Sequence, residues 1–305
     1  MKVFHNVMQA TGLYEVIRKW FTILVPTAIA PITMFIDAPF GRFTPQSDWQ
    51  RMFLIDGRVS WILMESVAFP IFGYAFLKSP LSATNFDSAP PLTLSHPPTL
   101  LAALYIIHYL NRAIISPLRS PSRSKAHIVV PLSAVGFHMA NAFLMGAYLS
   151  SPQADTYLHG AFQRPRFWIG LAVWTVGFVG NIVHDEVLLN IRRNAKVKGK
   201  AKEEDNNGKD KQEHYAIPHG YLYKYISFPN YFCEWVEWLA FAVAAAPTPA
   251  FTSTAALLAS IEPPYIFLTS EIFLMMPRAW RGHLWYKKRF PDYPKERKAA
   301  IPFLL

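Results

Sequence analysis

The sequence predicts an all-α membrane protein that crosses the bilayer about seven times, with its helices packed around a cavity. Hydrophobic residues make up 52% of the 305 residues and charged residues only 16%, whereas about a quarter of a soluble domain is charged. Apolar runs near the ~20 residues that cross hydrocarbon recur along the chain. Prolines interrupt the last two runs, and lipid tolerates them only where neighbours or trapped water satisfy the freed carbonyls.

The expected spans follow the apolar runs in order. They are residues 16–36, 59–77, 98–116, 127–149, 167–189, 232–250 and 252–277. The second and fifth runs are the clearest. The last two contain Pro247, Pro249, Pro263 and Pro264, which leave their boundaries open.

Basic residues gather in alternate loops and predict the orientation. They follow the first, third and fifth spans and fill the C-terminus, as at Arg42, Arg119, Arg192 and Arg278. The opposite loops carry only Lys78, Arg164 and Arg166. The positive-inside rule therefore predicts a cytosolic C-terminus and a lumenal N-terminus, although Lys2, Arg18 and Lys19 disagree. We expect residues 1–150 to form the N-terminal helices and 151–305 a C-terminal domain.

Other classes of protein are disfavoured by the same charges and by the cysteine count. The net charge of +10 is divided among separate loops and forms no single basic stripe for nucleic acid. Residues 196–213 mix both signs and predict a flexible cytosolic insertion. The single cysteine, Cys233, excludes an internal disulfide, and no cluster with metal-ligand spacing is present.

A dinucleotide would have to bind inside the helical bundle, because the chain has neither GxGxxG nor a Walker loop. Its phosphates would then need side-chain cations, for which arginine is well suited. The candidates near the expected cytosolic ends are Arg112, Arg119, Arg123, Arg192 and Arg278.

Polar residues recur where a span is expected to meet the bilayer edge. Asn181 and Asp185 stand four apart and share a helix face. Asn230, Glu234 and Glu237 lie within the aromatic run 215–238. A carboxylate at this depth persists mainly with a partner. Spacing alone leaves two interpretations open: a headgroup boundary with an aromatic belt, or a ligand site.

Two polar residues lie deeper. Glu65 has no cation nearby in its own segment, so desolvation is expected to keep it protonated. With the Tyr109 hydroxyl it could stabilise the negative charge that develops on a carbonyl oxygen when hydride adds to an enone. The alternative for Glu65 is an interhelical hydrogen bond.

The C-terminal part of the chain resembles the steroid 5α-reductase family. Asn181-Ile-Val-His184-Asp185 is similar to the family element N-I-x-x-D, and residues 215–234 follow Y-x-I-P … N-[FY]-x-x-E. The resemblance implies NADPH as cofactor. It implies cofactor contacts at Arg112, Asn181, Asp185, Arg192, Tyr215, Asn230, Tyr231, Glu234, Arg278, His283 and Tyr286.

The resemblance also implies a catalytic pair. Glu65 falls in Arg58-x-x-Trp61-x-x-x-Glu65, and Tyr109 falls in His108-Tyr109-x-x-Arg112. Trp61 and Met64 are then expected beside the substrate. Two positions depart from the family: Met64 replaces a common Gln, which puts a steroid substrate in doubt, and Gly282 replaces the first of two histidines, which puts a cofactor contact in doubt.

We therefore expect an NADPH-dependent reductase of a conjugated C=C bond in a lipophilic enone, most simply a 3-oxo-Δ4-steroid. It would lie in the endoplasmic reticulum membrane, take its substrate from lipid, and need no metal and no obligate protein partner. The alternatives are a polyprenol reductase or a trans-2-enoyl-CoA reductase of the same superfamily. A membrane methyltransferase and a non-catalytic lipid-binding protein remain as alternatives from other classes.

Overall fold

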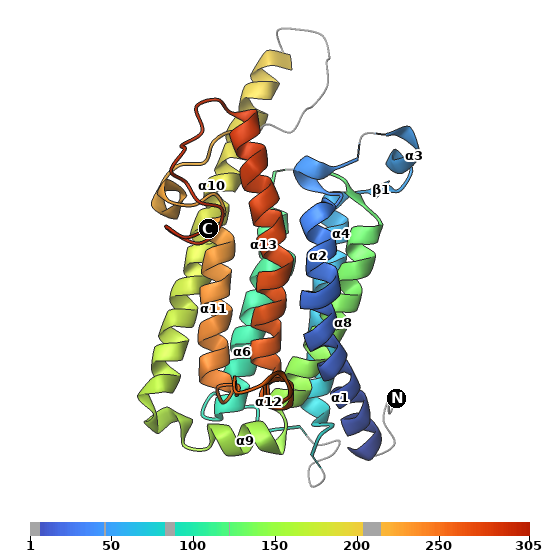
Figure 1. The fold of residues 1–305 in the computed structure, drawn as a ribbon, viewed down its shortest axis with the longest axis vertical. Helices are drawn as coiled ribbons and strands as arrows, with labels where there is room; N and C mark the ends of the chain where they lie inside the picture. The colour runs from blue at the N-terminus through green and yellow to red at the C-terminus, as the bar shows by residue number, and fades with distance from the viewer. Residues whose placement is uncertain (1–6, 46, 83–88, 122, 204–214) are drawn as a thin grey trace.

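A computed structural model shows a bundle of long, nearly parallel helices with short elements across both ends (Figure 1). It describes residues 7–45, 47–82, 89–121, 123–203 and 215–305. The expected all-α membrane architecture is confirmed. The described residues contain one sheet, of two short strands.

The bundle is built from helices of very different lengths. The α-helices are α1 Val7–Leu24, α2 Ala30–Phe35, α3 Asp48–Arg51, α4 Gly57–Ser66, α5 Ala68–Lys78, α6 Pro97–Tyr109, α7 Ser116–Arg119, α8 Val129–Leu149, α9 Pro152–Leu158, α10 Pro165–Glu203, α11 Pro229–Ala245, α12 Thr254–Ser260 and α13 Pro263–Arg289. The π-helices are η1 Val25–Ile29 and η3 Leu110–Ile115, the 3₁₀-helices are η2 Gly41–Phe43, η4 Ala161–Gln163 and η5 Tyr221–Lys224, and the strands are β1 Leu54–Ile55 and β2 Ala126–His127.

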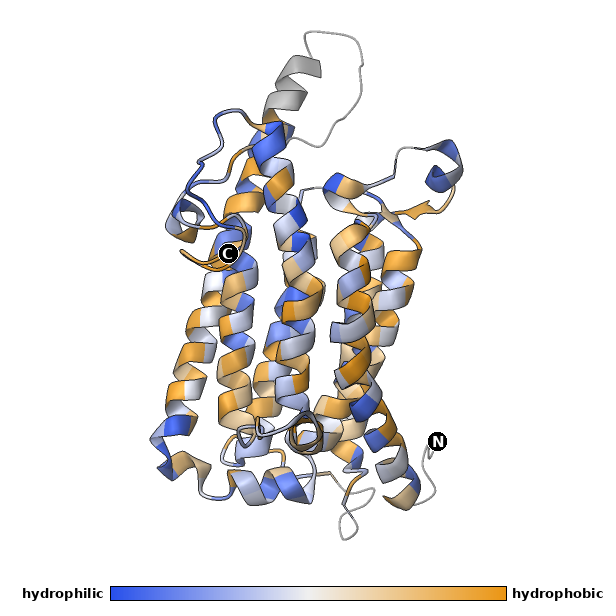
Figure 2. Ribbon diagram, in the orientation of Figure 1, coloured by the Kyte–Doolittle hydropathy of each residue, from blue (hydrophilic) through white to orange (hydrophobic). Residues whose placement is uncertain are grey.

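Fewer helices than the expected seven are long and apolar enough to cross a membrane. Among the described residues there are five, or six if the bent pair α12 and α13 counts as one span. The difference is α11, whose 17 residues fall short of the ~20 that a crossing needs. Hydrophobic residues predominate along most of the helices, and hydrophilic residues are most frequent toward the two ends of the bundle (Figure 2).

Pro263 and Pro264 begin a helix instead of interrupting one. Pro263 and Pro264 occupy the first turn of α13, where the missing N–H costs nothing. The short helix α12 meets α13 at a bend of 117°. The span expected at 252–277 is therefore two helices, the short α12 and, after the bend, the long α13. The preceding helix, α11, ends at Ala245, before Pro247.

Loops that are distant in the sequence meet at one end of the bundle, the upper end in Figure 1. β1 pairs antiparallel with β2, which joins the loops after the first and third spans. Ile226 forms a parallel bridge with Lys298, which ties the C-terminal segment to the start of α11. The basic loops expected on one side of the membrane thus lie together.

Close backbone contact between α10 and α11 positions polar residues of both helices. A Cβ at Gly177 would lie 2.6 Å from the backbone nitrogen of Glu237 and 2.8 Å from the Cys233 carbonyl oxygen, so only glycine fits. One turn beyond, Asn181 and Asp185 of α10 face Asn230 and Glu234 of α11. The same helix continues to Glu203. Residues 196–203 are therefore helical, and 204–213 lie outside the described residues, so the flexible insertion expected at 196–213 stays a prediction.

Candidate active site

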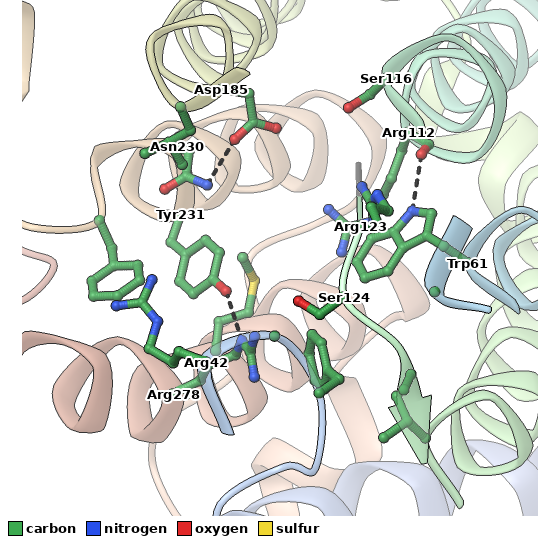
Figure 3. A pocket seen from close by; sticks show the side chains of 18 of the residues that line it. Arg42, Trp61, Arg112, Ser116, Arg123, Ser124, Asp185, Asn230, Tyr231 and Arg278 are labelled. Carbon is green, nitrogen blue, oxygen red and sulfur yellow. Dashed lines mark hydrogen bonds between the residues drawn. The ribbon is translucent and has the colours of Figure 1, made fainter. Parts of the chain in front are cut away.

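A cavity of about 300 Å³ opens at the end of the bundle where these loops meet. Most residues that the sequence singles out line it, namely Trp61, Met64, Arg112, Asn181, Asp185, Arg192, Asn230, Tyr231, Glu234 and Arg278. They come from α4, η3, α10, α11 and α13, so segments that are distant in the sequence form the cavity together (Figure 3).

The α10 and α11 side of the cavity is a network of amides and carboxylates. Asn181 Nδ2 donates to Glu234 Oε2 and to the Asn230 carbonyl oxygen, each over 3.1 Å. Asn230 Nδ2 donates to Asp185 Oδ1 over 2.9 Å (Figure 3). The amide nitrogen of Asn230 is therefore hydrogen-bonded, but the buried amide oxygen, Oδ1, has no hydrogen-bond partner.

Arg112 bridges two buried carboxylates. Its Nε donates to Glu65 Oε1 over 3.1 Å and its Nη1 to Glu234 Oε1 over 2.8 Å. Both glutamates are only 2% exposed. Glu65 has no cation in its own segment, but a guanidinium from another helix pairs with it, so the expectation that desolvation keeps it protonated is wrong. Arg112 lines the cavity, but two of its guanidinium nitrogens already donate hydrogen bonds to carboxylates of the protein.

The expected catalytic pair lies behind the cavity wall, deeper in the bundle. Glu65 and Tyr109 meet through a third residue, His138 of α8. Its Nε2 lies 3.3 Å from Glu65 Oε2, and its Nδ1 lies 3.5 Å from the Tyr109 hydroxyl. Asn141, also on α8, donates from Nδ2 to that hydroxyl over 3.3 Å.

Sequence reasoning missed three polar residues of this network. His138 and Asn141 stand three apart inside the apolar helix α8, and His108 lies one turn before Arg112 and 2.7 Å from Glu237 Oε1 through its Nδ1. All three are almost fully buried. A polar side chain inside a membrane span is a functional candidate by default, and that signal would have found them.

Arg119, Arg123 and Arg278 differ in which of their guanidinium nitrogens remain unpaired and can bind a ligand. Arg119 is engaged, because its Nη2 lies 2.7 Å from Glu186 Oε2. The Arg123 guanidinium lies 4.1 Å from the centre of the Trp61 ring, and its Nε has no hydrogen-bond partner. Arg278 donates from Nε to the Tyr231 hydroxyl over 3.2 Å, and its Nη1 is unpaired (Figure 3). Burial and the neighbouring Arg192 lower the pKa of the Arg123 guanidinium to about 10, which keeps it charged at neutral pH.

The 3₁₀-helix η2 lines one side of the cavity. The Arg42 guanidinium lies 4.6 Å from the centre of the Tyr286 ring, 4.9 Å from that of Trp285 and 5.5 Å from that of Tyr215. Tyr215 and Tyr286, both expected at the cofactor, thus adjoin the cavity through Arg42 and do not line it.

His283 lies apart from the cavity. Its Nδ1 is 2.6 Å from Ser227 Oγ, which in turn is 2.6 Å from the Tyr293 hydroxyl. A Cβ at Gly282 beside it would overlap the outer end of the Phe228 ring, so a side chain there requires that ring to shift. The departure from two adjacent histidines therefore has a packing reason.

Met64 and Trp61, both from the helix that carries Glu65, line the cavity. Met64 is 5% exposed and lines the cavity one residue before Glu65. Trp61 Nε1 donates to the Arg112 carbonyl oxygen over 3.2 Å, which fixes α4 against η3 (Figure 3). An apolar thioether thus stands where the family commonly has an amide.

The fold and this cavity define a class: a polytopic helical membrane protein with a polar, arginine-rich cavity at one end of its bundle and a buried phenol and carboxylate behind it. Comparisons with known proteins give the family. The sequence pattern of the 3-oxo-5-alpha-steroid 4-dehydrogenase family matches residues 124–305. The chain belongs to this family of membrane oxidoreductases.

Several relatives match along nearly the whole chain. An uncharacterised protein of Schizosaccharomyces pombe is 38% identical over 91% of this chain and 94% of its own length. The 3-oxo-5-alpha-steroid 4-dehydrogenase 1 of Rattus norvegicus is 30% identical over 88% of this chain and 87% of its own length. The steroid 5-alpha-reductase DET2 of Gossypium hirsutum is 30% identical over 93% and 94%.

Proposed function

We propose that the protein uses NADPH to reduce the conjugated C=C bond of a lipophilic enone, with a 3-oxo-Δ4-steroid as the first candidate and its 5α-dihydro ketone as the product. The observation that carries the proposal is the cavity itself. It gathers unpaired arginine nitrogens and an unpaired amide oxygen, and the buried Tyr109 and Glu65 lie behind its wall. Relatives named as steroid reductases support the substrate class.

The residues around the cavity fit a reduced dinucleotide phosphate. The free nitrogens of Arg123 and Arg278 need acceptors, which phosphate oxygens supply in charge-assisted hydrogen bonds. The free Oδ1 of Asn230 needs a donor, which an amide N–H or a ribose hydroxyl supplies. Asp185, Glu234 and Asn181 add oriented acceptors and donors on the same wall. The bound cofactor would supply the hydride.

The protein's part in the reaction falls to Tyr109 and Glu65. Addition of hydride to the β-carbon moves negative charge onto the carbonyl oxygen, and a hydroxyl hydrogen aimed at that oxygen stabilises it. Tyr109 provides this hydrogen. Glu65, paired with Arg112, fixes the position of the polar groups next to the phenol. Water reaching the cavity supplies the proton that the α-carbon takes up.

Substrate and cofactor would reach this site from different phases. The apolar helix faces of the bundle allow a lipophilic enone to enter from the bilayer. The polar cavity opens at the end of the bundle that carries the basic loops, where a soluble cofactor can enter. We place this end in the cytosol and the protein in the endoplasmic reticulum membrane, in line with the positive-inside rule.

Turnover with a panel of enones tests the proposal. Membranes containing the protein are incubated with NADPH and a mixture of a 3-oxo-Δ4-steroid, a polyprenal and a trans-2-enoyl-CoA, and products are identified by mass spectrometry. The expected result is a gain of two hydrogens in the steroid. Glu65→Gln and Tyr109→Phe variants, matched for expression, should lose that product while still binding NADPH.

Each rival has its own outcome in the same experiment. Reduction of only the polyprenal or only the enoyl-CoA would replace the steroid by that substrate class. A methylated product that requires S-adenosylmethionine would identify a methyltransferase. Full activity in both variants would remove Glu65 and Tyr109 from the reaction, and no change in any substrate, with no NADPH binding, would favour a lipid-binding protein.

A further inference from the structure

The Tyr109 hydroxyl meets two buried partners from α8 that no earlier expectation included. Asn141 Nδ2 donates to it over 3.3 Å, and His138 Nδ1 lies 3.5 Å away. The other ring nitrogen of His138, Nε2, lies 3.3 Å from Glu65 Oε2. The imidazole, 6% exposed, thus stands directly between the phenol and the carboxylate.

The neutral form of His138 directs the Tyr109 hydrogen toward α8. A neutral imidazole carries one N–H, and a carboxylate can only accept. Nε2, which faces the Glu65 carboxylate at 3.3 Å without meeting hydrogen-bond geometry, therefore carries the hydrogen, which leaves Nδ1 as an acceptor. Among the described residues, the hydrogen that can reach Nδ1 is that of the Tyr109 hydroxyl, because the Asn141 amide donates to the hydroxyls of Tyr105 and Tyr109. In this state the Tyr109 hydroxyl hydrogen points to His138 Nδ1 and is not available to a substrate carbonyl.

The protonated form reverses this arrangement. Both nitrogens of an imidazolium donate, so Nδ1–H donates to the Tyr109 oxygen and the hydroxyl hydrogen is free for another acceptor. Among the described residues, the groups whose charge acts on His138 are Glu65 of α4, His108 of α6 and Arg112 of η3. The Glu65 carboxylate is the counter-ion of the His138 imidazolium. The carboxyl group of Glu271, on α13, interacts electrostatically with Tyr109 and with Glu65.

We propose that His138 is the positioning residue of Tyr109, and that its protonated form is the working form because it turns the hydroxyl hydrogen toward the substrate carbonyl. This inference rests on the proposed function and deepens it. No covalent bond forms or breaks at His138. The change is one of hydrogen-bond direction, through Tyr109.

The test compares pH profiles of turnover for wild type, His138→Leu and His138→Asn. For the wild type, kcat should fall about tenfold or more as rising pH removes the proton from the His138 imidazolium. His138→Leu should lower kcat about 10- to 100-fold at pH 6 and flatten the profile. Without His138 the Tyr109 hydroxyl is no longer aimed at the carbonyl oxygen and stabilises its developing charge much less. His138→Asn supplies an amide donor at every pH, so its profile should be flat and near the wild-type plateau at low pH.

Three controls separate this role from a merely structural one. KM for NADPH and the thermal midpoint should stay unchanged in His138→Asn, which carries the test if His138→Leu fails to fold. His159→Asn, an exposed histidine, should leave the profile as it is. In a Tyr109→Phe background, which binds cofactor but does not turn over, His138→Leu should cause no further weakening of ketone binding, since the effect passes through the hydroxyl.

Ligand binding gives a readout that does not depend on turnover. With NADP⁺ present, the saturated ketone product should bind more weakly as pH rises in the wild type but not in His138→Asn, as followed by tryptophan fluorescence. A wild-type pH dependence retained in His138→Asn, or an equal loss in the Tyr109→Phe background, overturns the inference. A wild type that reduces no enone overturns the proposed function instead.

Discussion

Arg112 Nε donates to Glu65 Oε1 over 3.1 Å, which joins the cavity to the buried groups behind it. The same guanidinium reaches Glu234 from Nη1, so one cation serves two carboxylates from two other helices. Buried charges are tolerated only when paired. This pairing therefore explains how α4, η3 and α11 can bring their polar faces together inside an apolar bundle.

Loss of this cation should destabilise the protein strongly. Arg112→Leu leaves Glu65 and Glu234 buried without their guanidinium, and breaking a buried ion pair from one side costs about 3–5 kcal/mol. The free energy of unfolding, measured by denaturant titration in detergent, should fall by that amount. Arg119→Leu is the matched control. Its pair with Glu186 is partly exposed and should be worth less than about 1 kcal/mol, so equal losses in the two variants would contradict the role of Arg112.

Arg123 should contribute to cofactor affinity more than to turnover. Its guanidinium lines the cavity with Nε unpaired, and a hydrogen bond to a charged group is worth about 1.5–3 kcal/mol. Arg123→Ala should therefore raise KM for NADPH about 10- to 100-fold with kcat changed much less. Because the pKa of this guanidinium is lowered to about 10, its charge is present below that pH and lost above it. NADPH affinity in the wild type, followed by cofactor fluorescence, should thus weaken above about pH 10, and Arg119→Ala should leave affinity at neutral pH unchanged.

The sequence predicts the cavity better than it predicts the buried pair. Asn181 and Asp185 share a helix face by their spacing, and Asn230 and Glu234 do likewise, so each helix already presents its polar residues together. The partner of Glu65 could not be predicted in this way. Arg112 and His138 come from helices 47 and 73 residues further along the chain, and only the packing of α4 against η3 and α8 brings them together.

The helix ends show a similar limit. Pro263 and Pro264 have two physical outcomes, a broken span or the first turn of a new one, and the apolar residues on both sides fit either. The bend of 117° between α12 and α13 follows from tertiary packing. Arg18 helps to fix it, because its Nη1 donates to the carbonyl oxygens of Leu258 and Ile261 at the end of α12.

Glycine at the α10–α11 contact should be indispensable. Gly177→Ala would place a Cβ 2.6 Å from the backbone nitrogen of Glu237, so the two helices must separate and move Asn181 away from Glu234. We expect a lower thermal midpoint and weaker NADPH binding. Gly136→Ala on α8 is the matched control, because a Cβ there meets nothing within 4 Å, and it should be neutral or slightly stabilising. An unchanged thermal midpoint in Gly177→Ala would show that this contact is looser than described.

Asp56 should stabilise the start of α4, the helix that carries Trp61, Met64 and Glu65. Its Oδ1 accepts from the backbone N–H of Val59 over 2.8 Å and from that of Arg58 over 2.9 Å. Asp56→Ala removes this cap and should cost about 1 kcal/mol of unfolding free energy, whereas Asp56→Asn should cost little because asparagine caps equally well. The hydrogen bond from Val59 lowers the pKa of the Asp56 carboxyl in the folded protein. Its stabilisation is therefore complete above the unfolded pKa of about 3.9 and is lost as pH falls through the lower folded value. Thermal midpoints measured between pH 7 and about 3 should fall more steeply for wild type than for Asp56→Asn, and parallel curves would exclude Asp56 as the source.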